Sequence, residues 1–259
     1  MLFEAREILI LLLFFLPLER IIPLRPAQPV FRRRWQDDLL YFILNPWLIR
    51  GAAVALFAIL LKPLQEIVPS SVPAFISELP IWVQVIAAMI VAELGFYAMH
   101  RLFHAVPFLW RFHAVHHSIE DLDWLAAHRV HPVDQIMSST ASLLPLLLLG
   151  FTAEAIAIKS FGYFLQSHLV HANIRLRLGP LEHVLASPHF HHWHHAQGAA
   201  PANFGGQLVF LDQLFGTYLR PRHMPGDYGI ADPVPALFPL ALLWPFTRPA
   251  APAILESAE

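Results

Sequence analysis

Histidine is the residue type in this sequence whose number and spacing could do chemistry. The chain has 16 histidines, and all except His223 lie between His100 and His195. His100 and His104, in the motif HRLFH, are four residues apart near the end of a long apolar segment. On a helix this spacing places two imidazoles on one face, with Cβ atoms about 5–6 Å apart. Such a pair is suited to sharing one metal ion.

Two denser boxes repeat this helical spacing. They comprise His113, His116 and His117 in HAVHH, and His191, His194 and His195 at the end of HFHHWHH. Two looser pairs lie between them, His128 with His131 and His168 with His171. A single histidine in an apolar chain is usually a satisfied core residue, but that explanation does not fit two HxxHH boxes beside an HxxxH pair. Buried neutral imidazoles need partners for their ring nitrogens, and metal ions supply them. The pattern therefore predicts a metal site.

The candidate ligands exceed what one ion can hold, so about eight or nine ligating histidines predict two metal ions. An all-nitrogen set suits iron, zinc or copper and disfavours magnesium and calcium, which prefer oxygen ligands. The chain has no cysteine and no HExxH motif, which excludes thiolate and iron–sulfur sites and argues against a zinc hydrolase. We expect the remaining histidines to be structural or to support the ligands: His128, His183, His189, His192 and His223.

The composition indicates a membrane setting for this site. Of the 259 residues, 56% are hydrophobic and 14% charged, against about 45–50% and 25% in average soluble domains. The mean hydropathy is +0.52. These values exclude a disordered chain, a coiled coil and an ordinary soluble enzyme. A net charge of −2 gives no basic face for a nucleic-acid partner.

Four apolar regions predict the helices that position the histidines. The segment 8–18 is short for a span of about 20 residues, and we interpret it as a retained anchor rather than a signal peptide, because acidic residues flank it. The segment 39–61 is interrupted by Asn45, Pro46 and Arg50, whereas 79–99 is the clearest span. The arms 142–151 and 153–170 predict a hairpin that enters the membrane and returns.

These regions predict an all-α integral membrane protein with about four transmembrane or hairpin helices carrying a cytosolic, histidine-rich helical cap. We expect one domain over 1–259, with membrane helices in 1–99, the histidine-box region in 100–230 and an interfacial tail in 231–259. The tail is apolar, but four prolines between residues 231 and 246 would break a spanning helix.

Basic residues predict the orientation of these helices. The arginines between the first two apolar runs are Arg20, Arg25, Arg32, Arg33 and Arg34, whereas the loop 62–78 has one lysine and no arginine. The former loop is expected to be cytoplasmic and the latter extracytoplasmic. A third span then returns to the cytoplasm at His100. All the histidine boxes are therefore predicted to lie on the cytoplasmic side of a multi-pass protein.

A carboxylate within the third span needs a reason, because intramembrane charge is costly. Glu93, Tyr97, His100 and His104 form one helical stripe. We expect Glu93 to accept a hydrogen bond from a ligand histidine and so fix its tautomer; the alternative is a carboxylate satisfied by glutamine or backbone. Glu93, Tyr97, Asn203 and Asp212 are our candidates for residues that support the ligands. Redox metals held at a membrane surface among apolar helices point to dioxygen activation on a lipid.

The ordered motifs resemble those of the fatty acid hydroxylase / sterol desaturase superfamily over about residues 32–222. They are HRLFH, HAVHH, HHSIEDLDWLAAHRVHP, the HAN that begins at His171, and SPHFHHWHH followed by NFGGQLVFLDQLFGTY. The resemblance implies an integral membrane di-iron oxygenase that acts on lipids. It also implies the metal ligands, which are His100, His104, His113, His116, His117, His131, His171, His191, His194 and His195, with His168 less certain.

Some positions depart from the family pattern without touching the boxes. Leu211 precedes Asp212 where tryptophan is common, and Asp123 stands where many members have asparagine. His192 and His128 also replace more usual residues. These departures bear on the shape of the pocket and the substrate rather than on metal binding.

The implied activity is that of an oxidoreductase with two iron ions, although zinc can occupy a purified sample. It hydroxylates a lipid, such as a sterol or fatty acyl chain, with dioxygen; a desaturase on the same site is the alternative. No GxGxxG, haem or cysteine motif is present, so a separate cytochrome or ferredoxin with its reductase is expected. Candidate docking residues are Arg111, Arg129, Arg175 and Arg177. A metal transporter, a cytochrome and a non-catalytic family member remain rival hypotheses.

Overall fold

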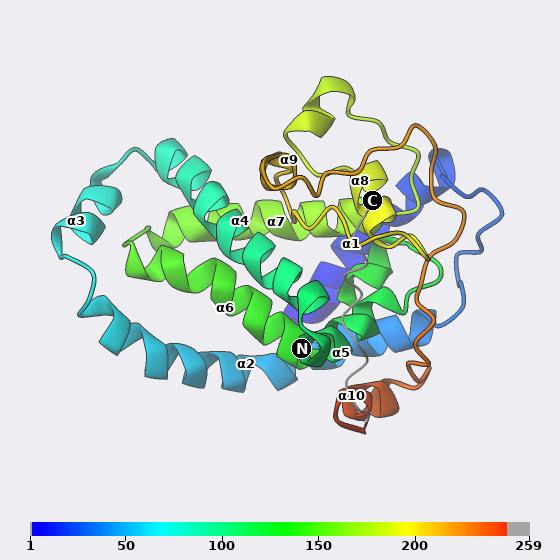
Figure 1. Ribbon diagram of the computed structural model, residues 1–259, viewed down its shortest axis with the longest axis horizontal. Coiled ribbons are helices and arrows are strands. Elements are labelled where there is room, and N and C mark those ends of the chain that lie inside the picture. The colour runs from blue at the N-terminus through cyan, green and yellow to red at the C-terminus, as the bar shows by residue number, and fades with distance from the viewer. Residues whose placement is uncertain (1, 248–259) are drawn as a thin grey trace.

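The computed structural model describes residues 2–247, and within this range the chain is helical, with three isolated β-bridges and no strand (Figure 1). The elements are, in order, α1 (Leu2–Ile21), α2 (Trp35–Gln65), α3 (Ser71–Glu78), α4 (Ile81–Ala105), α5 (Pro107–His117), η1 (Trp124–His128), α6 (Pro132–Leu148), α7 (Ala153–His171), η2 (Gly179–His183), α8 (Pro188–His194), α9 (Phe210–Leu214) and α10 (Phe238–Thr247). The predicted all-α class is confirmed. Figure 1 shows α2, α4, α6 and α7 extending to the left, while the short helices and loops after α7 gather on the right.

Two helices of the described residues, α2 and α4, are long and apolar enough to cross a membrane. Helix α2 contains the predicted segment 39–61, and α4 contains residues 81–99 of the predicted segment 79–99. Asn45, Pro46 and Arg50 interrupt the apolar run of the first segment without ending its helix, since α2 is continuous over 31 residues. The Asn45 amide donates to the Val130 carbonyl at 2.7 Å, which links α2 to the start of α6. The predicted anchor 8–18 lies within α1.

Helices α6 and α7 form the predicted hairpin, although its first arm begins at Pro132 rather than at residue 142. The earlier start has a local cause, since Pro132 occupies the first helical turn and His131 Nδ1 accepts the Val133 N–H at 3.1 Å. Gly150 turns the chain with a φ of +81°, and a Cβ there would lie 2.5 Å from the Pro73 Cα. Only glycine fits this turn without strain.

Gln84, the polar residue within the second candidate span, fastens this turn to α4. Its Oε1 accepts both the backbone N–H and the hydroxyl of Thr152 at 3.0 Å, and its Nε2 donates to the Leu79 carbonyl at 2.8 Å. The side chain is buried. Because both polar atoms of this buried amide have hydrogen-bond partners, the side chain stabilises the end of the helical bundle that is remote from the histidines.

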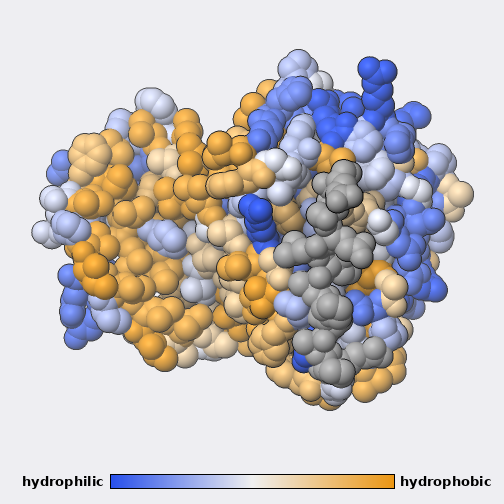
Figure 2. Space-filling view, in the orientation of Figure 1, coloured by the Kyte–Doolittle hydropathy of each residue, from blue (hydrophilic) through white to orange (hydrophobic). Residues whose placement is uncertain are grey.

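The surface divides into an apolar and a polar part. Figure 2 shows apolar residues over the left half of the molecule, where α2, α4 and α6 lie, and hydrophilic residues concentrated on the right. On the apolar part, Val54, Trp82 and Phe161 are 69%, 65% and 63% exposed. Soluble monomers rarely expose such contiguous apolar surface. The distribution supports membrane association of the left half.

A buried ionic network joins the first turn of α2 to the segment after α5. The guanidinium of Arg32 donates to Asp38 at 2.5 Å and to Asp123 at 2.6 Å, while Arg129 donates twice to Asp38. All four side chains are at least nine-tenths buried. Paired in this way, the four charges offset one another's loss of hydration, and removing any one of them would leave a costly unpaired charge.

Glu19 adds a second buried connection, at the end of α1. Its Oε1 accepts the backbone N–H groups of Trp124 and Asn173, each at 2.9 Å. Burial is the main cause that raises the pKa of this carboxyl to about 7. One side chain thereby connects α1 to the first residue of η1 and to the segment that follows α7.

The predicted interfacial tail contains a helix, α10, which packs against α5 and α2. Phe246 meets Phe112 with ring centroids 5.5 Å apart, and Phe238 meets Tyr41 at 4.6 Å. Helix α10 has 10 residues with Pro245 inside it, too short to span a bilayer. The remainder of the tail, 248–259, lies outside the described residues.

Gly95 lets α4 and α6 approach closely, so we predict that Gly95→Ala destabilises the protein. A Cβ at this position would lie 1.9 Å from the Ala141 carbonyl oxygen. Forced separation of packed helices should lower the free energy of unfolding by about 1–3 kcal/mol, measured as a lower unfolding temperature in detergent. Gly162→Ala is the matched control, because a Cβ there meets nothing within 4 Å and alanine favours helix by about 1 kcal/mol. Equal unfolding temperatures for the two variants would contradict the prediction.

Candidate metal centre

Nine buried histidines assemble into two groups whose ring nitrogens face inward. The first group is His100, His104, His113, His117 and His194, and the second is His116, His171, His191 and His195. Within each group the candidate ligand atoms all lie within 4.8 Å of one another. The histidines come from the ends of α4 and α7 and from α5 and α8. Segments up to 95 residues apart in the sequence therefore meet at one point.

Helical periodicity divides each HxxHH box between the two groups. In α5, His113 and His117 face the first group, while His116 faces the second. The box at α8 does the reverse, since His191 and His195 face the second group and His194 the first. On a helix, the first and last histidines of a box, four residues apart, lie on nearly the same face. The middle histidine, three residues after the first, is rotated away from that face toward the other group. Each box thus helps to build both groups.

Backbone carbonyls fix the tautomers of four of these histidines. A carbonyl only accepts, so each of these Nδ1 atoms carries the proton and each Nε2 keeps a free lone pair. The Nδ1–H groups of His100, His116, His171 and His194 donate to Phe204, Arg129, Ser167 and Ala202 at 2.7, 3.1, 2.7 and 2.7 Å. Their Nε2 atoms are left as ligands for a cation.

The Nε2 atoms converge in a way that only a cation satisfies. His116 and His171 both hold their proton on Nδ1, yet their Nε2 atoms are 3.3 Å apart. Two lone pairs at this distance repel each other and cannot form a hydrogen bond. The Nε2 atoms of His104 and His194 are buried without a hydrogen-bond partner among the described residues. An all-imidazole donor set of this kind fits a transition-metal ion in each group.

Burial also keeps the imidazoles neutral, as ligation requires. Loss of hydration is the main cause that lowers the pKa of His113, His117 and His194 well below the ordinary value of 6.5. His116, His191 and His195 show the same direction for the same main reason, with neighbouring imidazoles adding to it. Neutral rings with free lone pairs are available at physiological pH.

A carboxylate that the sequence analysis missed orients one ligand. Asp134 Oδ2 lies 2.7 Å from His113 Nδ1, and its Oδ1 accepts the Ser138 hydroxyl at 3.1 Å. A carboxylate behind a ligand histidine fixes the ring and raises its basicity. The available signal was an acidic residue three positions after His131, in the first turn of a helix that is otherwise free of charge.

Glu93 accepts hydrogen bonds from the backbone. Our expectation that it bonds to a ligand histidine is therefore wrong, and the alternative of a backbone partner holds. The N–H groups of Gly206 and Gln207 donate to it at 2.6 and 3.0 Å. Asp212 likewise accepts the N–H groups of Phe204 and Gly205, at 2.7 and 2.8 Å. The two carboxylates hold the loop that presents the carbonyls of Ala202 and Phe204 to the ligand histidines.

Asn203 and Tyr97 complete this loop. Asn203 has a φ of 60°, and its amide donates to the carbonyls of Phe190 and Leu219 at 2.8 Å. Tyr97 exchanges a hydrogen bond with the Thr217 hydroxyl at 2.9 Å. All four candidate supporting residues therefore stabilise the backbone behind the ligands rather than the ligands themselves.

Two of the histidines carried over from the family pattern lie outside both groups. His131 uses both ring nitrogens elsewhere, since Nδ1 accepts from Val133 and Nε2 donates to the Leu242 carbonyl at 3.0 Å. His168 donates through Nδ1 to Phe164, and its Nε2 accepts from His128 Nε2 at 2.8 Å. Both His131 and His168 are thus satisfied by neutral hydrogen bonds without a metal. Neither belongs to the ligand set.

Arg129 is also placed differently from its expected role as a docking residue for an electron donor. Its side chain is 1% exposed and bonded to Asp38. The burial fixes the Arg129 backbone, whose carbonyl orients His116. The ionic network was not anticipated, because nothing in the sequence pairs arginines and aspartates that lie 91 residues apart.

A cavity of about 360 Å³ adjoins the histidines. His100, His113, His116, His171 and His191 line one part of it, and residues of α6 and α7 form most of the remainder, with contributions from α4, η1 and the loop at Gly205. Its volume lies within the range of about 300–1,000 Å³ that is usual for small-molecule sites. Histidines of both groups therefore line one cavity.

These features define a helical, membrane-associated protein with two adjacent groups of buried histidines suited to binding metal. The sequence model of the Fatty acid hydroxylase family matches residues 85–217, which include all nine grouped histidines. The match covers half of the chain, and the chain belongs to this family.

Similar proteins include lipid hydroxylases. An ornithine lipid hydroxylase of Rhizobium tropici is 37% identical over 65% of this chain and 52% of its own length. The alkylglycerol monooxygenase of Homo sapiens is 30% identical over 60% of this chain and 34% of its own length. The chain thus spans about half of the first relative and about a third of the second. No solved structure matches it.

Asp134→Asn should weaken metal binding to the first group while the fold is retained. The amide has nearly the same shape but no charge, so it supports His113 less well; such changes typically lower metal affinity 10–100-fold. Titration of the metal-free protein with Fe(II) or Co(II) would measure this loss. Asp227→Asn, at an exposed position, is the control. Unchanged affinity in Asp134→Asn would contradict the role of the carboxylate.

The metal-free protein should lose stability as the pH falls. The folded state keeps the imidazoles neutral, whereas the unfolded chain binds protons below its pKa of about 6.5. Protons therefore favour unfolding, and the unfolding temperature should fall between about pH 7.5 and about pH 5.5. The triple variant His191→Ala, His194→Ala, His195→Ala should show a shallower dependence. A flat or rising profile in the parent protein would show that these rings are not held neutral.

Proposed function

We propose that this protein is a membrane-bound, non-haem di-iron oxygenase that hydroxylates a lipid. The observation that carries the proposal is the convergence of unprotonated Nε2 atoms in two adjacent groups beside a cavity. Iron is favoured over zinc because the named relatives are a hydroxylase and a monooxygenase, and insertion of oxygen needs a redox-active ion. Those names also favour hydroxylation over desaturation.

The residues of the chain bind the metal ions, orient the lipid and exclude water from the site. His113, His116 and their partners hold the ions through neutral nitrogens, with tautomers set by Asp134 and by backbone carbonyls. Iron, when bound, supplies the activation of dioxygen and the oxidation of a C–H bond. The cavity holds the lipid so that one carbon lies beside the histidines and water is kept from the reaction.

The substrate we propose is a lipid that carries a polar group at one end. The relatives act, by their names, on an ornithine lipid and on alkylglycerols, which share a polar end and a long apolar chain. Exposed apolar side chains on α2, α4 and α7, the last of which also lines the cavity, are suited to a bilayer in which such lipids are dissolved. Exposed Arg175, together with Arg177, is a candidate docking point for an external electron donor.

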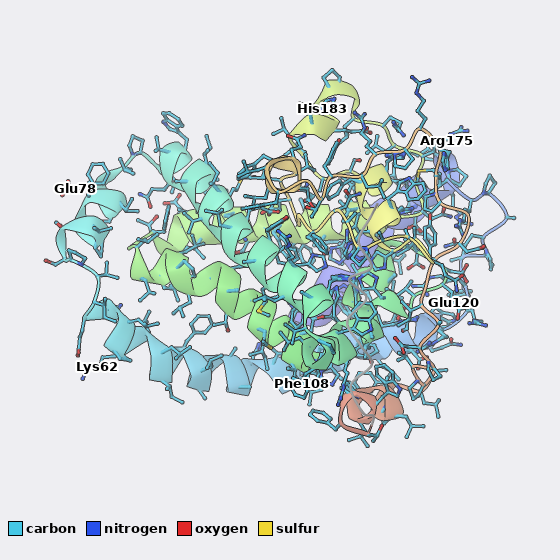
Figure 3. All side chains as sticks on the ribbon, in the orientation of Figure 1. Lys62, Glu78, Phe108, Glu120, Arg175 and His183 are labelled. Atoms are coloured by element: carbon cyan, nitrogen blue, oxygen red, sulfur yellow. The ribbon has the colours of Figure 1, made fainter. Side chains whose placement is uncertain are left out.

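We further propose that the histidine groups lie on the cytoplasmic side. The arginine-rich loop before α2 packs against the histidine region, where Arg25 donates to the Gly226 carbonyl and stacks on Tyr228. Figure 3 shows Lys62 and Glu78 at the opposite end of the molecule from Glu120 and Arg175. An arginine-rich face near the histidines and an arginine-free opposite loop support this orientation.

Metal content and lipid oxidation test the proposal together. Protein purified anaerobically should hold about two iron or surrogate ions per chain, and the triple variant His191→Ala, His194→Ala, His195→Ala should lose them. With a chemical or enzymatic reductant and dioxygen, the parent protein should add one oxygen atom to a lipid from a membrane extract. The control is His183→Ala with His223→Ala, since both side chains are exposed. A folded protein that binds no redox metal would overturn the proposal.

A further inference from the structure

Lys159 is a buried cation in the wall of the cavity. It lies near the middle of α7, is 6% exposed and lines the same cavity as the histidines. In the described part of the chain, its ammonium has no hydrogen-bond acceptor and no ion-pair partner; its recorded contact is the Tyr163 ring, with the centroid 4.9 Å from Nζ. A buried charge left in this state is costly. A ligand that completes it is the simplest reason for its presence.

The nearest candidate counter-charge within the protein is already engaged. Glu93 attracts Lys159 electrostatically, but the carboxylate accepts the N–H groups of Gly206 and Gln207 at 2.6 and 3.0 Å. It holds the loop behind the ligand histidines in place and does not bond to the ammonium. Lys159 therefore lines the cavity without a hydrogen-bond acceptor among the described residues.

Hydroxyl groups line the same cavity as this ammonium. Ser142, Ser160, Ser167 and Tyr163 all contribute to the wall. Among the described residues, none of these hydroxyls has a hydrogen-bond partner. Apolar pockets for acyl chains do not need such donors. A cation and unpaired hydroxyls in one cavity wall instead form a donor set suited to an anionic oxygen group.

The position of Lys159 relative to the histidines fits a lipid held at one end. Twelve residues separate it from His171 along α7, which corresponds to about 18 Å of helix. Between the two, Tyr163 contacts Phe96 at 5.9 Å, and Phe96 contacts His100 at 5.3 Å. This aromatic wall provides an apolar path from the ammonium to the first histidine group.

We propose that Lys159, with the hydroxyls of Ser142, Ser160 and Tyr163, forms a subsite for a carboxylate or phosphate group of the lipid substrate. The anionic group binds at α7 and the apolar chain extends along Phe96 toward the histidines. This inference rests on the proposed function for the identity of the ligand as a lipid. With this subsite, the protein prefers an anionic lipid to a neutral lipid of equal chain length.

Direct binding to the purified protein tests the subsite. The probes are dodecanoate, dodecyl phosphate and the neutral dodecanol, with affinities from calorimetry in a neutral detergent. The parent protein should bind at least one anionic probe about tenfold more tightly than dodecanol, as expected for one charge-assisted hydrogen bond. The two anionic probes separate carboxylate from phosphate recognition. Lys159→Met should abolish the preference, and Lys159→Arg should retain most of it.

Lys62→Met is the matched control, because it removes an equal charge from an exposed position and should leave the preference unchanged. Equal affinity of the parent protein for dodecanoate, dodecyl phosphate and dodecanol would overturn the subsite, even if Lys159→Met does not fold. So would an unaltered preference in a folded Lys159→Met variant. Metal content and lipid oxidation in the same samples keep the two proposals apart, since loss of metal overturns the oxygenase and leaves the binding preference to be judged alone.

Discussion

The centre of this protein depends on keeping nine buried imidazoles neutral with their lone pairs directed inward. Nothing in a histidine side chain decides which ring nitrogen carries the proton; the partner of Nδ1 does. Here the partners include the carbonyls of Arg129, Ser167, Ala202 and Phe204. The rest of the fold holds these carbonyls where the rings need them. Without a cation between them, the Nε2 lone pairs of His116 and His171 repel each other. The arrangement therefore favours binding of a cation.

Two sets of buried charges hold that backbone. Arg32, Asp38 and Asp123 fix the segment that ends at Arg129, and Glu93 with Asp212 fixes the loop around Phe204. Each charge is satisfied by backbone N–H groups or by an opposite charge, which reduces the penalty of burial. Lys159 is different, because the described residues give its ammonium no such partner. The contrast separates groups that stabilise the fold from a group that faces the cavity.

The division of the surface connects the site to the membrane. Apolar side chains cover α2 and α4, whereas the loops around the histidines are polar (Figure 2). Histidines and residues of α6 and α7 line one cavity. The histidine groups therefore lie where the long apolar helices meet the polar loops.

The sequence alone predicted the helical class and the long apolar helices, and its candidate ligands include all nine grouped histidines, because these features depend on local periodicity and on the coordination chemistry of one side-chain type. It did not determine which histidines share an ion, nor that His131 is occupied elsewhere, because both depend on how α4, α5, α7 and α8 meet. The roles of Asp134 behind His113 and of Lys159 in the cavity wall were equally hidden, and the sequence left open whether Glu93 bonds to a histidine or to backbone. A carboxylate or an ammonium acquires its role from neighbours brought together over long sequence separations, and only the tertiary structure supplies those neighbours.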